Sequence, residues 1–126
     1  MKTKIEIRKI AQVLDKIFPK QYQESYDNCG LIVGSPDMEC TGILTTLDIT
    51  PEIIEEAFQK NCNLIVSHHP VIFRGIKSLL DNTINNKSIM LAIEKKISIY
   101  AAHTSLDNRF AYGLNSHILY KLGLEK

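Results

Sequence analysis

The chain has 126 residues, of which 44% are hydrophobic and 23% are charged, and its formal net charge is +1. This length suits one small domain with a real hydrophobic core, and the balanced composition argues against disorder and against a nucleic-acid or membrane surface. No apolar run approaches the roughly 20 residues of a membrane span, and the N-terminus lacks the apolar core of a signal peptide, so we expect a cytoplasmic protein.

The first predicted element is a helix that begins at a capping box and ends at Pro19. Thr3 and Glu6 have the T-x-x-E spacing in which each side chain bonds the other's backbone N–H. Apolar residues then follow at helical spacing from Ile7 to Phe18, which gives the helix one apolar face. We expect this helix to cover a sheet and assign it no chemistry.

A polar loop over residues 21–28 precedes a predicted strand over residues 30–34. Its polar side chains Glu24, Asp27 and Asn28 fit turn chemistry, since Asp and Asn bond their own backbone, and the alternative is a role in contacting substrate or orienting a metal ligand. The spacing alone favours the turn.

A strand–helix–strand unit follows. A strand over 43–47 leads to Thr50, which is expected to cap a helix with Pro51 at its first position, and the chain returns in a strand that begins at Leu64. Such a unit makes the two strands parallel with a right-handed crossover. Beyond a polar stretch at 81–86 we predict a helix over 88–96, a strand over 97–102 and a helix over 113–122 that Gly123 stops. The fold class is therefore α/β: residues 1–126 form one three-layer domain with a largely parallel sheet.

Four residues with metal-binding side chains come directly after two of the predicted strands. His68 and His69 end the run that begins at Leu64, and His103 and Asp107 follow the strand over 97–102. Ligands of open parallel sheets bind beyond the carboxyl ends of the strands, and imidazole and carboxylate suit zinc, iron, manganese or nickel. Our central hypothesis is that His68, His69 and Asp107 are metal ligands.

Alternatives remain at this point. Two adjacent histidines also occur in exposed loops, and His103 also fits a histidine satisfied inside the core. Neighbouring residues on an extended chain point to opposite sides, so His68 and His69 suit two metal ions better than one, with Asp107 bridging them. The fourth histidine, His117, lies on the last predicted helix and is expected to be a surface or packing residue.

The assembled motifs resemble the first domain of the GTP cyclohydrolase I type 2 homolog family, also called the Nif-three-like proteins. The resemblance runs in family order over essentially the whole chain. The matching segments are Glu24 to Leu31 with Val33-Gly34, Thr46 to Thr50, Leu64 to Pro70 with Ile72-Phe73, and Ala101 to Asp107 followed by Gly113 and Asn115.

The resemblance implies a dinuclear metal site. Its ligands in the family are the two histidines of an H-H-P motif, the aspartate of an H-T-x-L-D motif, and a later histidine and glutamate in an H-x-x-x-E motif. The first three fall on His68, His69 and Asp107 of this sequence. The resemblance also implies two similar α/β halves, assembly into toroidal hexamers, and a named activity that opens the guanine ring of GTP by hydrolysis.

This sequence departs from the family pattern because it has no second half and no H-x-x-x-E motif. Three protein groups shared between two ions fall short of the roughly three ligands that one catalytic zinc keeps. We therefore expect a dinuclear metal-binding domain of a metal-dependent hydrolase that is incomplete on its own, as a fragment or as a short form completed by another chain.

With a complete site the expected chemistry is metal-assisted hydrolysis of a small molecule, a nucleotide or another phosphorylated or cyclic-amide compound. His103 is expected to act as general base or to orient a ligand, and Asp48 and Asn28 to support the ligands. The alternative is a non-catalytic metal-binding or protein-interaction module. A phosphoesterase with a D-H-H motif fits poorly, because Ser67 precedes His68.

Overall fold

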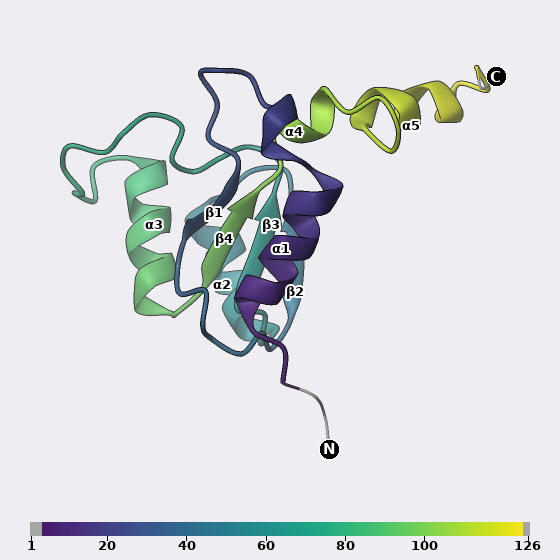
Figure 1. The fold of residues 1–126 in the computed structure, drawn as a ribbon. Helices are drawn as coiled ribbons and strands as arrows, with labels where there is room; N and C mark the ends of the chain where they lie inside the picture. Colours follow the sequence, from purple (N-terminus) through teal and green to yellow (C-terminus); the bar gives the residue numbers. More distant parts are fainter. Residues whose placement is uncertain (1–3, 125–126) are drawn as a thin grey trace.

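The computed structural model describes residues 4–124, which form a four-stranded mixed sheet with helices on both faces (Figure 1). The strand order is β1-β4-β3-β2. The strands are β1 (Gly30–Val33), β2 (Ile43–Thr46), β3 (Leu64–Ser67) and β4 (Ser98–Ala101). The last three are mutually parallel, while β1 runs antiparallel to β4 at the sheet edge. The prediction of a largely parallel sheet is confirmed.

The predicted β2–α2–β3 unit is present. Helix α2 (Pro51–Gln59) begins after Thr50, whose hydroxyl accepts a hydrogen bond from the backbone N–H of Ile53 at 3.3 Å. Proline at the first helical position costs nothing, because its missing N–H would have no partner inside the helix. The strands β2 and β3 then pair in parallel from Ile43↔Leu64 to Thr46↔Ser67, so both end at the same edge of the sheet.

Helices cover the two faces of the sheet and make the three predicted layers. Helix α1 (Ile7–Ile17) lies on one face, whereas α2 and α3 (Ile84–Glu94) lie on the other (Figure 1). The face under α1 buries Ile7, Ala11, Leu64, Tyr100 and Ala102. The opposite face buries Val33, Ile49, Ile54, Ala57, Ile65, Val71, Ile89, Ala92, Ile97 and Ile99.

Two helix starts differ from the prediction. Thr3 lies outside the described residues, and Glu6 occupies the N-cap position of α1, without a side-chain cap, rather than the third helical position of a capping box. Glu6 forms an isolated antiparallel bridge with Glu39, so extended pairing holds the chain there until Ile7. Helix α3 begins four residues before the predicted start, because Thr83 accepts a hydrogen bond from the N–H of Asn86 at 3.1 Å and caps it.

Of the last two helices, only the second leaves the body of the domain, because the first buries Thr104 and Ser105. A single helical turn, α4 (Thr104–Asp107), follows His103, and α5 (Leu114–Lys121) projects from it (Figure 1). None of the residues of α5, all of which the structure describes, is buried. Gly123 ends the helix at φ +69°, a conformation that favours glycine, as predicted. Among residues 4–124, no helix is both long and apolar enough to cross a membrane.

Tyr100 joins the sheet to α1 by a hydrogen bond that can be tested. Its side chain is 1% exposed, and its hydroxyl donates to Asp15 Oδ1 at 2.9 Å. Burial and the bond to Asp15 raise the pKa of the phenol well above its ordinary value. We expect the Tyr100→Phe variant to lose about 1 kcal/mol of unfolding free energy at neutral pH, the net worth of one hydrogen bond.

The pH dependence has a definite sign. Because folding raises the pKa of Tyr100, its contribution is fully present below the unfolded pKa of about 10 and is lost as pH rises above it. Urea unfolding should therefore show the advantage of the wild type over Tyr100→Phe shrinking and then reversing in alkaline buffer. Tyr120→Phe, at a tyrosine that is 57% exposed, is the matched control and should change neither quantity. A constant difference across pH would contradict the assignment.

Candidate metal centre

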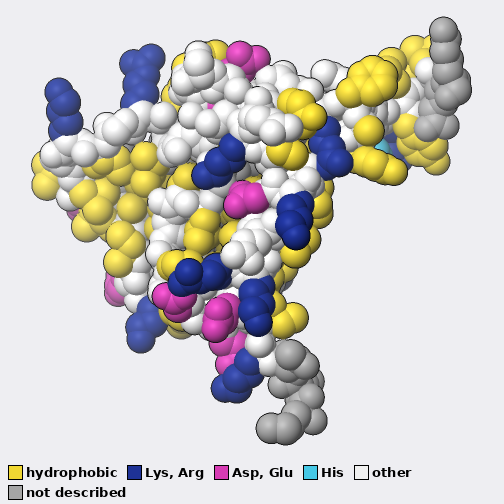
Figure 2. Space-filling view, viewed as in Figure 1, with side chains coloured by type: hydrophobic (Ala, Val, Ile, Leu, Met, Phe, Trp, Pro, Cys, Tyr) yellow, Lys and Arg dark blue, Asp and Glu magenta, His cyan; other side chains and the backbone are white. Residues whose placement is uncertain are grey.

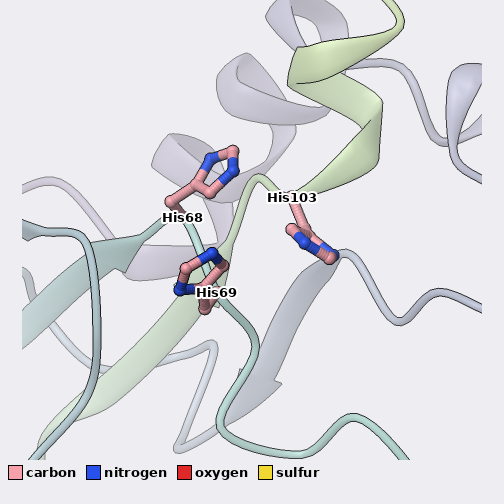
Figure 3. A group of neighbouring side chains, drawn as sticks. All are labelled: His68, His69 and His103. Carbon is pink, nitrogen blue, oxygen red and sulfur yellow. The ribbon is translucent and has the colours of Figure 1, made fainter.

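Three histidines converge where β3 and β4 end (Figure 3). His68 and His69 follow β3, and His103 follows β4, whose last residue pairs with the last residue of β3. The backbone N–H groups of His68 and His69 also donate to Thr46 O and Leu47 O at 3.1 and 3.0 Å, which continues the ladder with β2. The sheet therefore fixes the backbone of both histidines.

The three rings make a nearly equilateral triangle. Their centroids are 5.0 Å apart for His68 and His69, 5.3 Å for His68 and His103, and 5.5 Å for His69 and His103. One nitrogen from each ring lies within 4.8 Å of the others. Two nitrogens bound to one zinc at about 2.1 Å are at most about 4.2 Å apart, so small side-chain rotations suffice to place all three on one ion.

Asp107 is a fourth side chain that can bind a metal ion, and it lies next to His68. It lies at the end of α4, one turn beyond His103, and its Oδ1 is 3.5 Å from His68 Nε2. That oxygen is buried and has no hydrogen-bond partner within residues 4–124. A buried carboxylate oxygen without a donor is costly, and a bound cation removes the cost. The donor set therefore fits a divalent metal ion.

In each of the other two histidines, a carboxylate oxygen lies within hydrogen-bonding distance of the Nδ1 atom. His69 Nδ1 lies 2.6 Å from Asp48 Oδ1, with side chains that are 48% and 60% exposed. His103 Nδ1 lies 2.9 Å from Asp27 Oδ1, and here the Asp27 side chain is 0% exposed. In both pairs Nε2 is the nitrogen left for a metal ion or a proton.

Asp27 is held by several donors besides His103. Its Oδ2 accepts from the backbone N–H of Thr104 at 2.9 Å and from the Thr104 hydroxyl, and Cys29 Sγ lies 3.2 Å from the same oxygen. Its Oδ1 also accepts from the N–H of Asn28 at 2.7 Å. The Thr104 hydroxyl accepts in turn from the backbone N–H of Glu24 at 2.9 Å.

The electrostatics favour an anionic Asp27 and a neutral His68. Burial opposes ionisation of Asp27, but the hydrogen bonds from Thr104, His103 and Cys29 outweigh it and hold the pKa of this carboxyl well below its ordinary value. Burial lowers the pKa of His68, Asp107 raises it, and His69 and His103 lower it further, with a net decrease. Neutral imidazole is the form that binds metals, so this shift suits a ligand.

The cluster opens into a shallow hollow of about 500 Å³. It is lined by Thr45, Thr46, Leu47, His68, His69 and Leu114. The ends of β2 and β3 form its floor, and Leu114, the first residue of α5, forms part of its wall. A small molecule can therefore approach His68 and His69 from solvent.

The structure brings together all four predicted site residues, His68, His69, His103 and Asp107. His117 is exposed on α5, as expected. Asn28 lies beside the site but donates to Ile72 O at 2.6 Å, so it holds the loop that follows the two histidines.

Asp27 was assigned to turn chemistry, and the structure instead directs it to His103. The reason is the direction of β1. Because β1 is antiparallel to β4, with Gly30 opposite Ala101, the residues before β1 meet the residues after β4. A parallel β1 would have sent residues 24–28 to the opposite edge. The available signal was a polar run directly before a buried strand, which the spacing alone did not distinguish from a turn.

Comparison with known proteins points to one family. A family model described as Duf34/NIF3 (NGG1p interacting factor 3) matches residues 5–126. A Clostridium acetobutylicum protein named GTP cyclohydrolase 1 type 2 homolog is 34% identical over 122 residues, which cover 97% of this chain and 45% of the relative. A Staphylococcus aureus protein of the same name is 40% identical over 121 residues, which cover 96% of this chain and 32% of the relative. The chain thus spans less than half the length of these relatives.

Two solved structures of similar proteins have the same fold as this chain. A crystal structure of a hypothetical protein from Staphylococcus aureus has a TM-score of 0.89 at 40% identity, covering 98% of this chain and 35% of that one. A Bacillus cereus protein described as related to NIF3 has a TM-score of 0.88 at 31% identity, covering 98% of this chain and 34% of that one. The fold of residues 4–124 is therefore the fold of one part of these longer proteins.

Thr104 offers a test of the polar network that does not depend on a metal. It is 8% exposed, and its hydroxyl links Asp27 to the backbone of Glu24. We expect Thr104→Val to lose about 1–3 kcal/mol of unfolding free energy in urea titrations, because it leaves the N–H of Glu24 unpaired and removes one donor to the buried Asp27 carboxylate. Thr104→Ser keeps the hydroxyl and should lose clearly less. Equal stability of the Val and Ser variants would rule out the network as described.

Proposed function

This chain belongs to the Duf34/NIF3 family, and we propose that it carries part of the dinuclear metal site of a metal-dependent hydrolase. The observation that supports the proposal most directly is the unpaired, buried Oδ1 of Asp107, which lies 3.5 Å from His68 Nε2 at the edge of a three-histidine cluster. Hydrogen bonding within residues 4–124 leaves this oxygen without a donor, and a divalent cation would supply its missing partner.

The ligands in this proposal are His68, His69 and Asp107. His68 and His69 leave β3 in succession with their ring centroids 5.0 Å apart, and Asp107 Oδ1 lies 3.5 Å from the Nε2 atom of His68. Two divalent ions, of zinc, iron, manganese or nickel, match imidazole and carboxylate donors. Three ligands are too few for two ions, so the remaining donors are proposed to come from outside this chain.

The chemistry of this proposal is hydrolysis. When bound, a pair of ions of this kind would lower the pKa of a water molecule to about 7 and polarise a substrate oxygen. The chain's own contribution is to hold the donors on strand ends, to keep His68 neutral, and to present His103 beside them as the general base that takes a proton from water. The shallow hollow over His68 and His69 leaves room for a small substrate.

The relatives support a proposal for the substrate and the assembly. Their printed name, GTP cyclohydrolase 1 type 2 homolog, suggests a nucleotide or another phosphorylated or cyclic-amide compound. We propose a homo-oligomer, a hexamer by the family resemblance. The apolar side chains of α5 support self-association, since Ile118, Leu119 and Tyr120 are 46%, 47% and 57% exposed.

A second function has one observation in its favour. Three histidine nitrogens lie within 4.8 Å of one another, and Asp107 Oδ1 lies 3.5 Å from His68 Nε2, so a small movement of Asp107 would give a single ion four protein ligands. Structural metal sites are closed in this way, whereas catalytic sites keep a position open. A non-catalytic metal-binding or protein-interaction module is therefore the alternative for the chain by itself.

Metal content tests the proposal directly. After dialysis without chelator, elemental analysis of the purified chain should find bound divalent metal, at fewer than two ions per chain because the donors from outside the chain are missing. The double variant His68→Ala, His69→Ala should lose nearly all of it, because two of the three proposed ligands are removed.

His117→Ala is the matched control. This histidine is exposed on α5, away from the cluster, and its removal should leave the metal content unchanged. Equal metal in the wild type and the double variant, or none in either, would refute a site built on His68 and His69 in this chain.

Self-association is the second test. Figure 2 shows hydrophobic side chains gathered over α5, and the exposed residues there include Phe110, Leu122 and Leu124 at 97%, 65% and 62%. Because a contiguous exposed apolar surface of this kind usually marks an interface, light scattering should give a mass above one chain at high concentration. The variant Ile118→Glu, Leu119→Glu should shift the mass toward the monomer.

Exposed apolar positions elsewhere provide the comparison. Val13 on α1 is 55% exposed, and Val13→Glu adds a charge to a surface helix without touching α5. This variant should keep the wild-type mass. A clean wild-type monomer at high concentration would count against the proposed assembly.

A further inference from the structure

The Asp27–His103 pair is built differently from the other carboxylate–histidine pair of the site. Asp48 and His69 are 60% and 48% exposed, so water competes for both side chains. Asp27 is 0% exposed and His103 is 21% exposed. An isolated, exposed ion pair contributes little to stability and does not fix the geometry of its side chains. A buried pair whose carboxylate oxygens all accept hydrogen bonds does fix that geometry.

Every group that contacts the Asp27 carboxylate is a donor. The backbone N–H groups of Asn28 and Thr104 lie at 2.7 and 2.9 Å, and they can only donate. The Thr104 hydroxyl accepts a hydrogen bond from the N–H of Glu24 and donates one to Asp27, and the S–H of Cys29 also donates to Asp27. Asp27 is thereby kept as an anion, with no proton to offer to His103. The proton shared over the 2.9 Å between them must come from the imidazole.

We infer that Asp27 is a positioning residue that holds His103 in the tautomer protonated at Nδ1, so that Nε2 carries the free lone pair beside His68 and His69. The consequence for catalysis rests on the proposed function, since Nε2 is then the atom that takes a proton from a water in the site. The tautomer itself does not depend on it. Free imidazole side chains in water favour the opposite tautomer, protonated at Nε2, which cannot accept a proton at that atom.

Replacement of Asp27 by Asn separates this role from packing. The side chain keeps its shape, but only its oxygen can accept, and its amide group turns two donors toward its surroundings. In the orientation that keeps both Thr104 donors on the oxygen, the amide takes the place of Oδ1. There it no longer accepts from the N–H of Asn28, and it donates to His103 Nδ1. The imidazole must then carry its proton on Nε2, which reverses the tautomer.

The experiment is long-range proton–nitrogen NMR of the imidazole rings in chelator-treated protein at about pH 8, above the ordinary histidine pKa of about 6.5. Peaks of His103 are assigned by their absence in His103→Gln. In the wild type we expect the pattern of a ring protonated at Nδ1. In Asp27→Asn we expect the pattern of a ring protonated at Nε2, or a mixture of the two.

Asp48→Asn is the matched control, because it makes the same change at the exposed pair. It should leave the pattern of His103 as in the wild type. A wild-type His103 protonated at Nε2 overturns the inference without any variant, so a failure of Asp27→Asn to fold does not protect it. An unchanged Nδ1–H pattern in a folded Asp27→Ala protein, which has no acceptor left for His103, overturns it as well.

This outcome is separable from that of the proposed function. The NMR measurement uses metal-free protein, so the tautomer stands or falls whether or not the chain binds ions. A confirmed tautomer with no metal in the elemental analysis would retain Asp27 as the positioning residue of His103 and reject the hydrolase site.

Discussion

The site depends on the position of β4 in the middle of the sheet, parallel to β3 on one side and antiparallel to β1 on the other. The parallel neighbour ends where β4 ends, and the antiparallel neighbour begins there. Three segments that are far apart in sequence therefore meet at one edge, around His68, His103 and Asp27. An all-parallel sheet of the same strands would have assembled the histidines without the buried carboxylate that holds one of them.

The gathering of metal-binding side chains could be predicted because it follows from local pattern and one general rule. An apolar run that ends in His68-His69 and another that ends in His103 are visible in the sequence, and parallel strands end at a common edge. The direction of an edge strand has no such signal. The glycine-bounded run 30–34 is equally compatible with either direction, and its true direction is decided by tertiary pairing with β4. Because the direction of β1 could not be predicted, the contact between Asp27 and His103 was not predicted either.

Helix starts show the same division between local and tertiary causes. Thr50 and Thr83 cap their helices through contacts with residues three positions ahead, which a sequence pattern can contain. The start of α1 is set instead by pairing between Glu6 and Glu39, a contact that no local pattern contains. The cap at Thr50 was predicted, whereas the equally local cap at Thr83 was missed because it lies inside a polar stretch. A partner a few residues away therefore made a cap visible in the sequence but did not by itself identify it.

The Oδ1 atom of Asp107 and the exposed apolar side chains of α5 lie on one continuous surface. Leu114 begins α5 and also lines the hollow that contains His68 and His69. Asp107, whose Oδ1 has no hydrogen-bond donor among the described residues, ends the helical turn that precedes α5. Whatever covers α5 therefore lies close to the metal ligands. A partner that buries Leu114 and adds donors at this edge would bind more tightly when ions are present, and by thermodynamic linkage the ions would bind more tightly to the associated form by the same factor. Metal binding and burial of α5 are thus expected to be coupled properties of this domain, because one surface serves both.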